Sequence, residues 1–540
     1  MNPRTPVDEF TPPWANFAAF FLGRDDVESD FLTELDHDRG NRAAWTVGAW
    51  QARVFQIGSW LDQQGVGPGD AVATLAGNTA DALALAYGCW VLGACVVPLN
   101  PGDSDSRQRH ILQDAGARLL IHADVARVDP LATGSGLRLI ATSRLPQRDT
   151  DPAAAAQWRP VLRGESLDVP ALRVYTSGTT GDPKGVVLTA ANLLIDCDAL
   201  ALRLAWSAGS RILTVLPVHH VNGLIVSSLL PWYGRHSTVL CDRFRSEIFW
   251  TDVAQERATV SSVVPSLLEF LLRTSGSAPE HFQEFLCGAG PLLVETAVEV
   301  EQRFEVPVRH LYGLSETTAV VTLMPVLDSE ERLTWHRDYG FPSIGPALPH
   351  VDVDVLDPHA HRADAGARGE LVARGGVVMR GYASNPDATE EAFRDGWFHS
   401  GDEGFWQPGP DEHRYFFITG RMKELIIRGG ANISPFEIDA VLRTHPAVRH
   451  GLAVPFDNRF YGEEVAAYIV RDADVSEEEI LAHCASQLDF ARCPKVVLFG
   501  DDVPYTATGK AKRLELRQRL APQLDQYRDV QFRRSARTSE

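Results

Sequence analysis

The segment Val174–Gly185, VYTSGTTGDPKG, decides how this chain is interpreted. A short apolar strand is predicted to end at Tyr175, and a helix is predicted to begin near Thr189. Between them, glycines let the backbone approach an anion, and successive N–H groups and hydroxyls can surround phosphate oxygens. Lys184 adds a mobile positive charge. The segment is not a P-loop, because it lacks G-x-x-x-x-G-K-[ST]. We predict a phosphate-binding loop, the alternative being a flexible surface loop.

The composition is that of a globular protein with an acidic surface. The chain has 540 residues, of which 44% are hydrophobic and 23% charged, and at roughly 150 residues per domain it holds three or four domain-sized units. Its 51 Lys and Arg against 71 Asp and Glu give a net charge of −20. Such a surface repels nucleic acid and anionic lipid, so neither is an expected partner. A local basic pocket for a small anion remains compatible with this charge.

The cysteines and the N-terminus indicate a cytoplasmic protein. Seven cysteines are scattered without a CxxC pair, so neither a zinc site nor a disulfide framework is indicated. We expect no signal peptide, because residues 1–6 contain no apolar stretch. The most apolar run, 83–99, contains Gly88 and Gly93 and is predicted to be a packed helix followed by a buried strand. We therefore expect no membrane span.

Helical and strand-like stretches alternate along most of the chain, which predicts parallel sheets covered by helices. From 351 onward, short strands with Gly and Pro turns suggest a small β-subdomain. A polar connector is expected at 149–170 and a solvated tail at 528–540. The expected helices are 49–64, 80–92, 190–203 and 435–444; the expected strands are 70–75, 94–98, 172–175, 211–215, 351–356, 369–372, 415–418, 448–454 and 465–470.

Four further segments follow in order: CGAGPL at 287–292, LYGLSET at 311–317, GWFHSGD at 396–402 and PYTATGKAKR at 504–513. Together with VYTSGTTGDPKG they resemble the motifs of the adenylate-forming superfamily over nearly the whole chain. This superfamily comprises acyl-CoA and aryl-CoA synthetases, the adenylation domains of non-ribosomal peptide synthetases and firefly-type luciferases. The resemblance implies an α/β fold with two domains. The large N-terminal domain, 1–420, would hold parallel-rich sheets and a β-subdomain, and a smaller mobile α+β domain would span 421–540.

The resemblance also implies roles for single residues. Tyr312 would pack on adenine, Ser315 would touch the α-phosphate, and Glu316 would hold Mg²⁺, a hard cation that prefers oxygen ligands. Asp402 would accept both ribose hydroxyls on its two carboxylate oxygens. The implied catalytic residues are Lys510, Glu316 and Thr179, and the implied ATP-binding residues are Thr176, Ser177, Gly178, Thr179, Thr180, Gly181, Lys184, Gly290, Leu311, Tyr312, Gly313, Ser315, Asp402, Arg421 and Lys510.

The stretch LPVHHVNG at 216–223 separates branches of the superfamily. Amino-acid-activating domains usually carry F-D-x-S here, with an aspartate for the substrate ammonium, and this chain has no such carboxylate. It therefore resembles the acyl-CoA and aryl-CoA synthetases. A metal site at His219 and His220 is not expected, because adjacent side chains point apart. The expected acyl-pocket residues are His220, Val221, Asn222, Gly288, Gly290, Leu314 and Val320.

The small domain is expected to pivot at Lys423 and to present Gly429 and Gly430 on the CoA side. It departs from the superfamily pattern at Ile427, where lysine is common, and at Ala431, where Glu or Phe is common. Arg428 follows Ile427, and the sequence leaves open whether it replaces the missing lysine.

These observations predict an ATP-dependent carboxylic acid:CoA ligase that uses ATP, Mg²⁺ and CoA. The carboxylate would attack MgATP to give acyl-AMP and pyrophosphate, and CoA would then give acyl-CoA and AMP. Lys510 would oppose the charge that develops in the first step. The mostly small or apolar pocket walls suggest a bulky or moderately long hydrophobic acid. The alternatives are a stand-alone adenylation enzyme that loads a carrier-protein thiol, and a non-catalytic nucleotide or acyl sensor.

Overall fold

The computed structural model describes residues 10–123, 131, 136–147, 166–176, 183–326, 331, 334–335, 338–339, 342–505 and 511–533, with the backbone alone at residue 432. Several predicted features lie outside these residues. They are most of the polar connector, the end of the tail, the loop residues 177–182 and Lys510.

A seven-stranded sheet forms the first part of the large unit. Its strands β7, β4, β3, β5 and β6 are parallel, as the alternating pattern predicts, while β8 and β17 add antiparallel pairs at one edge. The strand order is β17-β8-β7-β4-β3-β5-β6. The strands are β3 (Ala71–Leu75), β4 (Cys95–Pro98), β5 (Leu119–His122), β6 (Arg138–Ala141), β7 (Pro170–Thr176), β8 (Lys184–Thr189) and β17 (Gly381–Tyr382).

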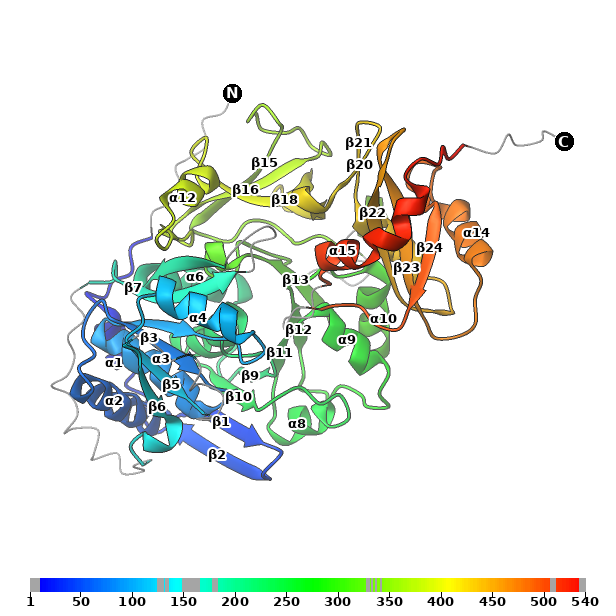
Figure 1. The fold of residues 1–540 in the computed structure, drawn as a ribbon. Coiled ribbons are helices and arrows are strands. Elements are labelled where there is room, and N and C mark those ends of the chain that lie inside the picture. Colours follow the sequence, from blue (N-terminus) through cyan, green and yellow to red (C-terminus); the bar gives the residue numbers. More distant parts are fainter. Residues whose placement is uncertain are drawn as a thin grey trace.

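Helices gather around this sheet in the blue and cyan part of Figure 1. The apolar run at 83–99 forms most of α3 and then β4, as predicted, and α3 ends at Gly93 in a left-handed conformation. None of the described helices is long and apolar enough to cross a membrane. The helices are α1 (Phe17–Leu22), α2 (Val47–Gln63), α3 (Ala80–Leu92), α4 (Asp105–Asp114) and α6 (Ala190–Leu204).

An eight-stranded sheet follows, with the order β14-β13-β12-β11-β9-β10-β1-β2. Its six inner strands are parallel and only β2 and β14 are antiparallel to their neighbours. The strands are β1 (Asp30–Asp36), β2 (Asn41–Thr46), β9 (Arg211–Thr214), β10 (Ser237–Cys241), β11 (Val260–Val263), β12 (Glu284–Cys287), β13 (Val308–Tyr312) and β14 (Thr322–Leu323). The accompanying helices are η4 (Asn222–Leu229), α7 (Leu230–Tyr233), α8 (Phe249–Gln255), α9 (Pro265–Leu272) and α10 (Val294–Phe304).

One hydrophobic core joins the two sheets. It contains buried side chains from α3, α6 and η4 together with strand residues such as Val96, Ile212 and Leu311. Because this core is continuous, the two sheets form one rigid frame, and the carboxyl ends of their strands are held at set positions.

Two further units complete the fold. The predicted β-subdomain is a four-stranded antiparallel sheet, β15-β16-β18-β19. The C-terminal unit, orange and red in Figure 1, is a mixed sheet with three helices. The elements of the first are β15 (Val351–Leu356), β16 (Gly369–Gly375), α12 (Pro386–Ala392), β18 (Phe398–Pro408) and β19 (Arg414–Arg421). Those of the second are β20 (Ile426–Arg428), β21 (Ala431–Ile433), α13 (Pro435–Arg443), β22 (Val448–Asn458), β23 (Gly462–Arg471), α14 (Glu477–Gln487), β24 (Val496–Gly500) and α15 (Arg513–Leu524).

The structure corrects one local prediction. The helix near Thr189 does begin at Ala190 with Thr189 as its N-cap, but it does not follow the glycine-rich loop directly. Strand β8 lies between them and pairs with β7 in antiparallel register. The sequence analysis missed it because a six-residue strand with glycine and threonine near its ends carries little periodic signal.

Candidate active site

The carboxyl ends of four parallel strands, β9, β11, β12 and β13, meet at one edge of the eight-stranded sheet. The segments after these strands contain His220, Val264, Gly288 and Leu314. Ligands bind at this edge in open α/β sheets. The topology therefore brings residues from the motifs at 216–223, 287–292 and 311–317 to one edge, together with Val264.

Asp402 is the best-defined acidic group near this edge. It is 5% exposed and lies directly opposite Arg421 in the β18–β19 pair. The Arg421 Nε donates to Oδ1 at 2.9 Å, and the Tyr312 hydroxyl donates to Oδ2 at 2.8 Å. A carboxylate oxygen has the capacity to accept more than one hydrogen bond, so both oxygens of Asp402 can still accept a ligand hydroxyl. The arrangement suits a pair of neighbouring hydroxyls.

The donors to Asp402 are held in the protonation states that they need. Burial raises the pKa of the Tyr312 hydroxyl well above its usual range, so it remains a donor. The Asp402 carboxylate raises the pKa of Arg421, which stays charged. Tyr312 ends β13, and its position connects the eight-stranded sheet to the β-subdomain.

Glu316 forms a second oxygen site. It lies half-buried in the short helix η5 (Ser315–Thr317), whose first residue is the predicted phosphate contact Ser315. The Tyr382 hydroxyl donates to Oε1 at 3.0 Å, and the backbone carbonyl of Glu316 accepts from Met379 N at 2.7 Å. The carboxylate is thus oriented by the chain. A single oriented carboxylate suits Mg²⁺, which usually takes one or two protein carboxylates and completes its shell with phosphates and water.

Lys184 and Tyr382 lie next to each other. Strand β17 pairs with β8, and the Lys184 Nζ lies 5.0 Å from the centre of the Tyr382 ring. Burial and the nearby Glu316 raise the pKa of the Tyr382 hydroxyl, which therefore acts as a donor. Lys184 is also the cross-strand partner of Thr176, so the two ends of the glycine-rich loop are joined. The predicted residues Ser177, Gly178, Thr179, Thr180 and Gly181 lie outside the described part of the chain.

Three predicted glycines differ in what they are needed for. A Cβ at Gly313 would lie 2.1 Å from the carbonyl oxygen of Ala319, and one at Gly288 would lie 2.4 Å from Leu311 Cδ1. A Cβ at Gly290 would lie no closer than 3.5 Å to its nearest neighbour, Pro265. Packing within the protein therefore requires glycine at 288 and 313, whereas Gly290 has room.

The two adjacent histidines touch, contrary to the expectation that they point apart. Their ring centres lie 4.5 Å apart, because the chain forms a turn here rather than a strand. Burial and the neighbouring His220 lower the pKa of His219 to about 3, so this ring is neutral at physiological pH. No cluster of three metal-ligating side chains was found among the described residues.

Hydrogen bonds fix both ends of the loop that carries His219 and His220. The buried Asn78 accepts from Val218 N at 2.9 Å and donates to the carbonyls of Leu216 and Cys241. At the other end, the Asn222 amide oxygen accepts from the Ser262 hydroxyl at 2.8 Å. Among the other predicted pocket residues, Val320 is 1% exposed, while Val221 and Leu314 are partly buried against the same core.

The predicted CoA-side glycines form a tight hairpin. Gly429 and Gly430 have φ of 57° and 87° and connect β20 to β21, with Arg428 opposite Ala431. A two-residue hairpin turn with two positive φ angles favours glycine without any ligand. Arg428 forms a 2.8 Å ion pair with the buried Glu464, whereas Ile427 is 52% exposed. Arg428 is thus used inside the small unit and does not occupy the exposed position of the missing lysine.

The ends of the segment that contains Lys510 lie close together. Tyr505 and Ala511 form an isolated antiparallel bridge, and the Lys512 N donates to the Pro504 carbonyl at 2.7 Å. Lys510 itself lies outside the described residues. The predicted hinge residue Lys423 is exposed in η6 (Met422–Glu424).

Sequence reasoning missed Tyr382 and Asn78. Each acts through a partner that is more than 60 residues away in the chain, Glu316 for Tyr382 and Val218 for Asn78. No local spacing distinguishes them from a surface tyrosine or a turn asparagine, so only their tertiary contacts reveal them.

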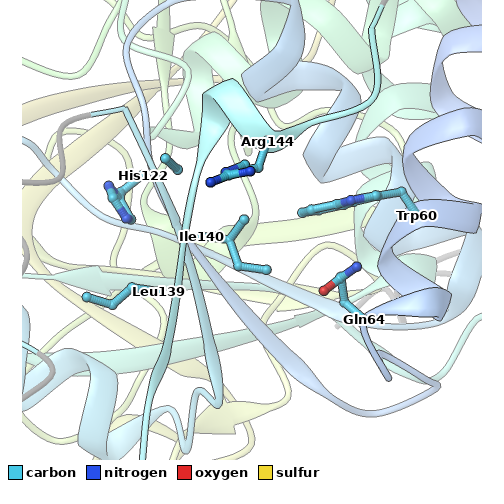
Figure 2. A pocket seen from close by; sticks show the side chains of 7 residues that line it. Trp60, Gln64, His122, Leu139, Ile140 and Arg144 are labelled. Carbon is cyan, nitrogen blue, oxygen red and sulfur yellow. The ribbon is translucent and has the colours of Figure 1, made fainter.

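A surface depression of about 410 Å³ at the edge strand β6 does not contribute to this site. It is lined by Trp60, Gln64, His122, Leu139, Ile140, Ala141 and Arg144. Figure 2 shows His122 and Leu139 on one side of the strand and Trp60 and Gln64 on the other. Because neighbouring strand residues face opposite sides of a sheet, the depression wraps around the strand end.

Comparison with known proteins gives matches along most of the chain. Residues 31–383 match the family of AMP-binding enzymes, and residues 437–510 match the AMP-binding enzyme C-terminal domain. The sulfoacetate–CoA ligase of Cupriavidus necator is 33% identical over 524 residues, which cover 96% of this chain and 99% of that protein.

Solved structures agree in fold. ATP-bound MatB from Rhodopseudomonas palustris has a TM-score of 0.82 at 27% identity and covers 94% of this chain and 99% of its own. The apo form of the same protein has a TM-score of 0.71 at equal identity and coverage. The O-succinylbenzoate coenzyme A synthetase MenE from Bacillus subtilis, with ATP and a magnesium ion, has a TM-score of 0.79 at 25% identity, covering 93% of this chain and 99% of its own.

Proposed function

The chain belongs to the family of AMP-binding enzymes, and on that premise we propose how it acts as an acid–thiol ligase that forms acyl-CoA through an acyl-adenylate. The observation that carries the proposal is the geometry of Asp402. This buried carboxylate receives Tyr312 and Arg421 on separate oxygens and keeps acceptor capacity on both. We assign it to the two ribose hydroxyls of ATP.

In the first step, an oxygen of the substrate carboxylate attacks the α-phosphorus of ATP. The bond from that phosphorus to the bridging oxygen breaks, and pyrophosphate leaves. Negative charge grows on the α-phosphoryl oxygens, which the loop 176–184 and Lys510 are assigned to oppose. The ribose contacts hold the nucleotide so that the acid approaches the α-phosphorus opposite the leaving group.

The chain fits a role for Mg²⁺ at Glu316. Mg²⁺, when bound with ATP, neutralises phosphate charge. The chain supplies one oriented carboxylate, that of Glu316, which accepts a hydrogen bond from the Tyr382 hydroxyl. This arrangement matches the usual pattern in which an outer hydrogen bond orients a metal ligand.

In the second step, the CoA sulfur attacks the acyl carbonyl carbon, and the bond to the AMP oxygen breaks. The thiol proton is lost to solvent, and no further base is assigned. Lys510 would have to leave the site to admit the thiol. We assign this movement to a rotation of residues 421–540 about Lys423, with the large domain at 1–420. Gly429 and Gly430 are assigned to the CoA side.

The acid is proposed from the pocket walls and the relatives together. The predicted walls favour a bulky or moderately long hydrophobic acid. The names of two relatives, a sulfoacetate–CoA ligase and an O-succinylbenzoate coenzyme A synthetase, instead refer to acids with a second acidic group. Both classes belong in the substrate test.

The seven free cysteines agree with a reducing compartment. We therefore place the reaction in the cytoplasm.

The test measures pyrophosphate release from MgATP over a panel of acids from both classes, and thioester formation when CoA is added. Lys510→Ala is expected to lower pyrophosphate release on the order of 10²–10³-fold. It should leave thioester formation from preformed acyl-adenylate nearly unchanged. Lys512→Ala is the matched control, because Lys512 lies two residues beyond Lys510 and its side chain pairs with Glu515 at 3.2 Å.

The outcomes separate the alternatives. Release of AMP with a carrier protein but not with CoA would replace the CoA ligase by a carrier-loading enzyme. Tight ATP binding without pyrophosphate release for every acid would favour a sensor. A Lys510→Ala variant within a few fold of the wild type would contradict the assigned role of that lysine.

A further inference from the structure

Two ion pairs attach helix α13 of the small unit to the large unit, which here includes the β-subdomain. The Arg368 Nη2, before β16, lies 2.6 Å from Glu437 Oε1, and the Arg443 Nη2 lies 3.6 Å from Glu269 Oε1 on α9. Both partners on α13 follow the proposed hinge at Lys423. A rotation about this hinge would move α13 away from Arg368 and Glu269. These pairs therefore depend on the orientation of the small domain.

The structure as a whole resembles ATP-bound MatB more closely than apo MatB. The TM-score is 0.82 with ATP-bound MatB and 0.71 with apo MatB, at the same identity and coverage. The ion pairs of α13 are thus present in a structure whose overall similarity is greater to the ATP-bound form.

We propose that Arg368 and Glu437 are positioning residues whose ion pair favours the adenylate-forming orientation of the small domain. This inference rests on the proposed two-step function. Neither residue is assigned to the nucleotide, the acid or the thiol. Their pair acts through the position of the small domain, and with it of Lys510.

The pair is better ordered than an isolated surface pair. Glu437 is 15% exposed and also lies 3.2 Å from Arg492 within the small unit, and Arg368 lies 3.6 Å from Glu403 within the large unit. Each side chain is thus held by its own unit before the two units meet, which lowers the entropy lost on pairing. A partly exposed pair shifts an equilibrium by up to about fivefold. Two orientations of similar free energy would be redistributed by the same factor.

A double-mutant cycle tests the proposal. Arg368→Gln and Glu437→Gln are made singly and together, and pyrophosphate release is compared with thioester formation from preformed acyl-adenylate. Each single variant should lower the ratio of the first rate to the second by about two- to fivefold. The double variant should go no further, because both changes remove the same pair. A loss of folding alone would lower both rates equally.

Asp352→Asn is the matched control. Asp352 pairs with Arg374 at 2.9 Å within the β-subdomain, and the two side chains are 15% and 47% exposed, close to the values of the proposed pair. This variant should leave the ratio unchanged. An unchanged ratio in the cycle variants, additive effects in the double variant, or an equal shift in the control would overturn the proposal.

A second readout does not depend on turnover. Dyes on Leu202→Cys in the large unit and Arg459→Cys in the small unit report the domain orientation by energy transfer with MgATP present. Cys493→Ser provides the background, because Cys493 is partly exposed and the other six cysteines are buried. Arg368→Gln and Glu437→Gln should shift the distance distribution, and an unchanged distribution refutes the proposal. A shifted distance distribution without any adenylate formation would support the role of the ion pair and refute the proposed function.

Discussion

Replacing Asp402 by asparagine tests the assignment of the ribose site. The amide oxygen can face the Arg421 Nε, which lies 2.9 Å from Oδ1, and the amide nitrogen can donate to the Tyr312 hydroxyl, 2.8 Å from Oδ2. A tyrosine hydroxyl can accept as well as donate. The internal contacts of the folded protein can therefore be kept, and the variant is expected to fold.

The substitution is expected to weaken the binding of ATP. Asparagine has one acceptor oxygen where aspartate has two, so one of the two ribose hydroxyls loses its acceptor. A hydrogen bond to a charged group contributes about 1.5–3 kcal/mol. The KM for ATP should therefore rise by about 10- to 150-fold, since 1.4 kcal/mol corresponds to a factor of ten.

The assay compares ATP with 2′-deoxyATP and 3′-deoxyATP in pyrophosphate release. The wild type should discriminate against both analogues, whereas Asp402→Asn should accept one of them about as well as ATP. Asp352→Asn, the same change at an ion pair of the neighbouring strands, controls for the substitution itself. A variant KM for ATP within threefold of the wild type, or unchanged discrimination against both analogues, would refute the assignment.

Three further changes test other parts of the site. Tyr382→Phe removes the donor to Glu316 and should raise the Mg²⁺ concentration for half activity by about tenfold, because it removes the outer contact that orients the ligand. Gly313→Ala places a Cβ 2.1 Å from the carbonyl oxygen of Ala319 and should lower the free energy of unfolding by about 1–3 kcal/mol or more. In Gly290→Ala the nearest atom to the new Cβ, Pro265 Cδ, lies 3.5 Å away, so this variant should be tolerated. His219→Phe should reduce the acid sensitivity of folding: the folded pKa of His219 is about 3, below its usual 6.5, so only the unfolded chain is protonated between these values. Lowering the pH from 7 to 5 should thus cost the wild type about 2 kcal/mol more than the variant in urea unfolding.

Each of these has a clear contrary result. An unchanged Mg²⁺ requirement in Tyr382→Phe would show that Tyr382 does not orient Glu316 for Mg²⁺. Equal stability of the two glycine variants would show that the backbone near residue 313 adapts. Parallel pH profiles for the wild type and His219→Phe would mean that His219 titrates alike in the folded and unfolded chain.

Three glycines that the sequence analysis placed near ligands also have a role in packing and turn geometry within the protein. Gly288 was expected in the acyl pocket, and Gly429 and Gly430 were expected on the CoA side. The structure requires Gly288 for its contact with Leu311, and the glycine pair forms a hairpin turn. The residue type was informative, but the immediate physical cause lies within the protein.

The sequence by itself determined several local elements and the family. Helix α3 and strands β3, β4 and β9 lie where their apolar periodicity predicts them, because burial on one or both faces leaves that pattern in the chain. The ordered motifs indicated an adenylate-forming ligase, which the family match confirms.

Only the tertiary structure decided which residues act together. The contact of Tyr382 with Glu316, the anchoring of Val218 by Asn78 and the pairing of Arg368 with Glu437 each join segments more than 60 residues apart. Local periodicity contains no record of such partners, because they meet only when the sheets and subdomains pack against one another. The same packing turned His219 and His220 toward each other and buried Arg428 against Glu464.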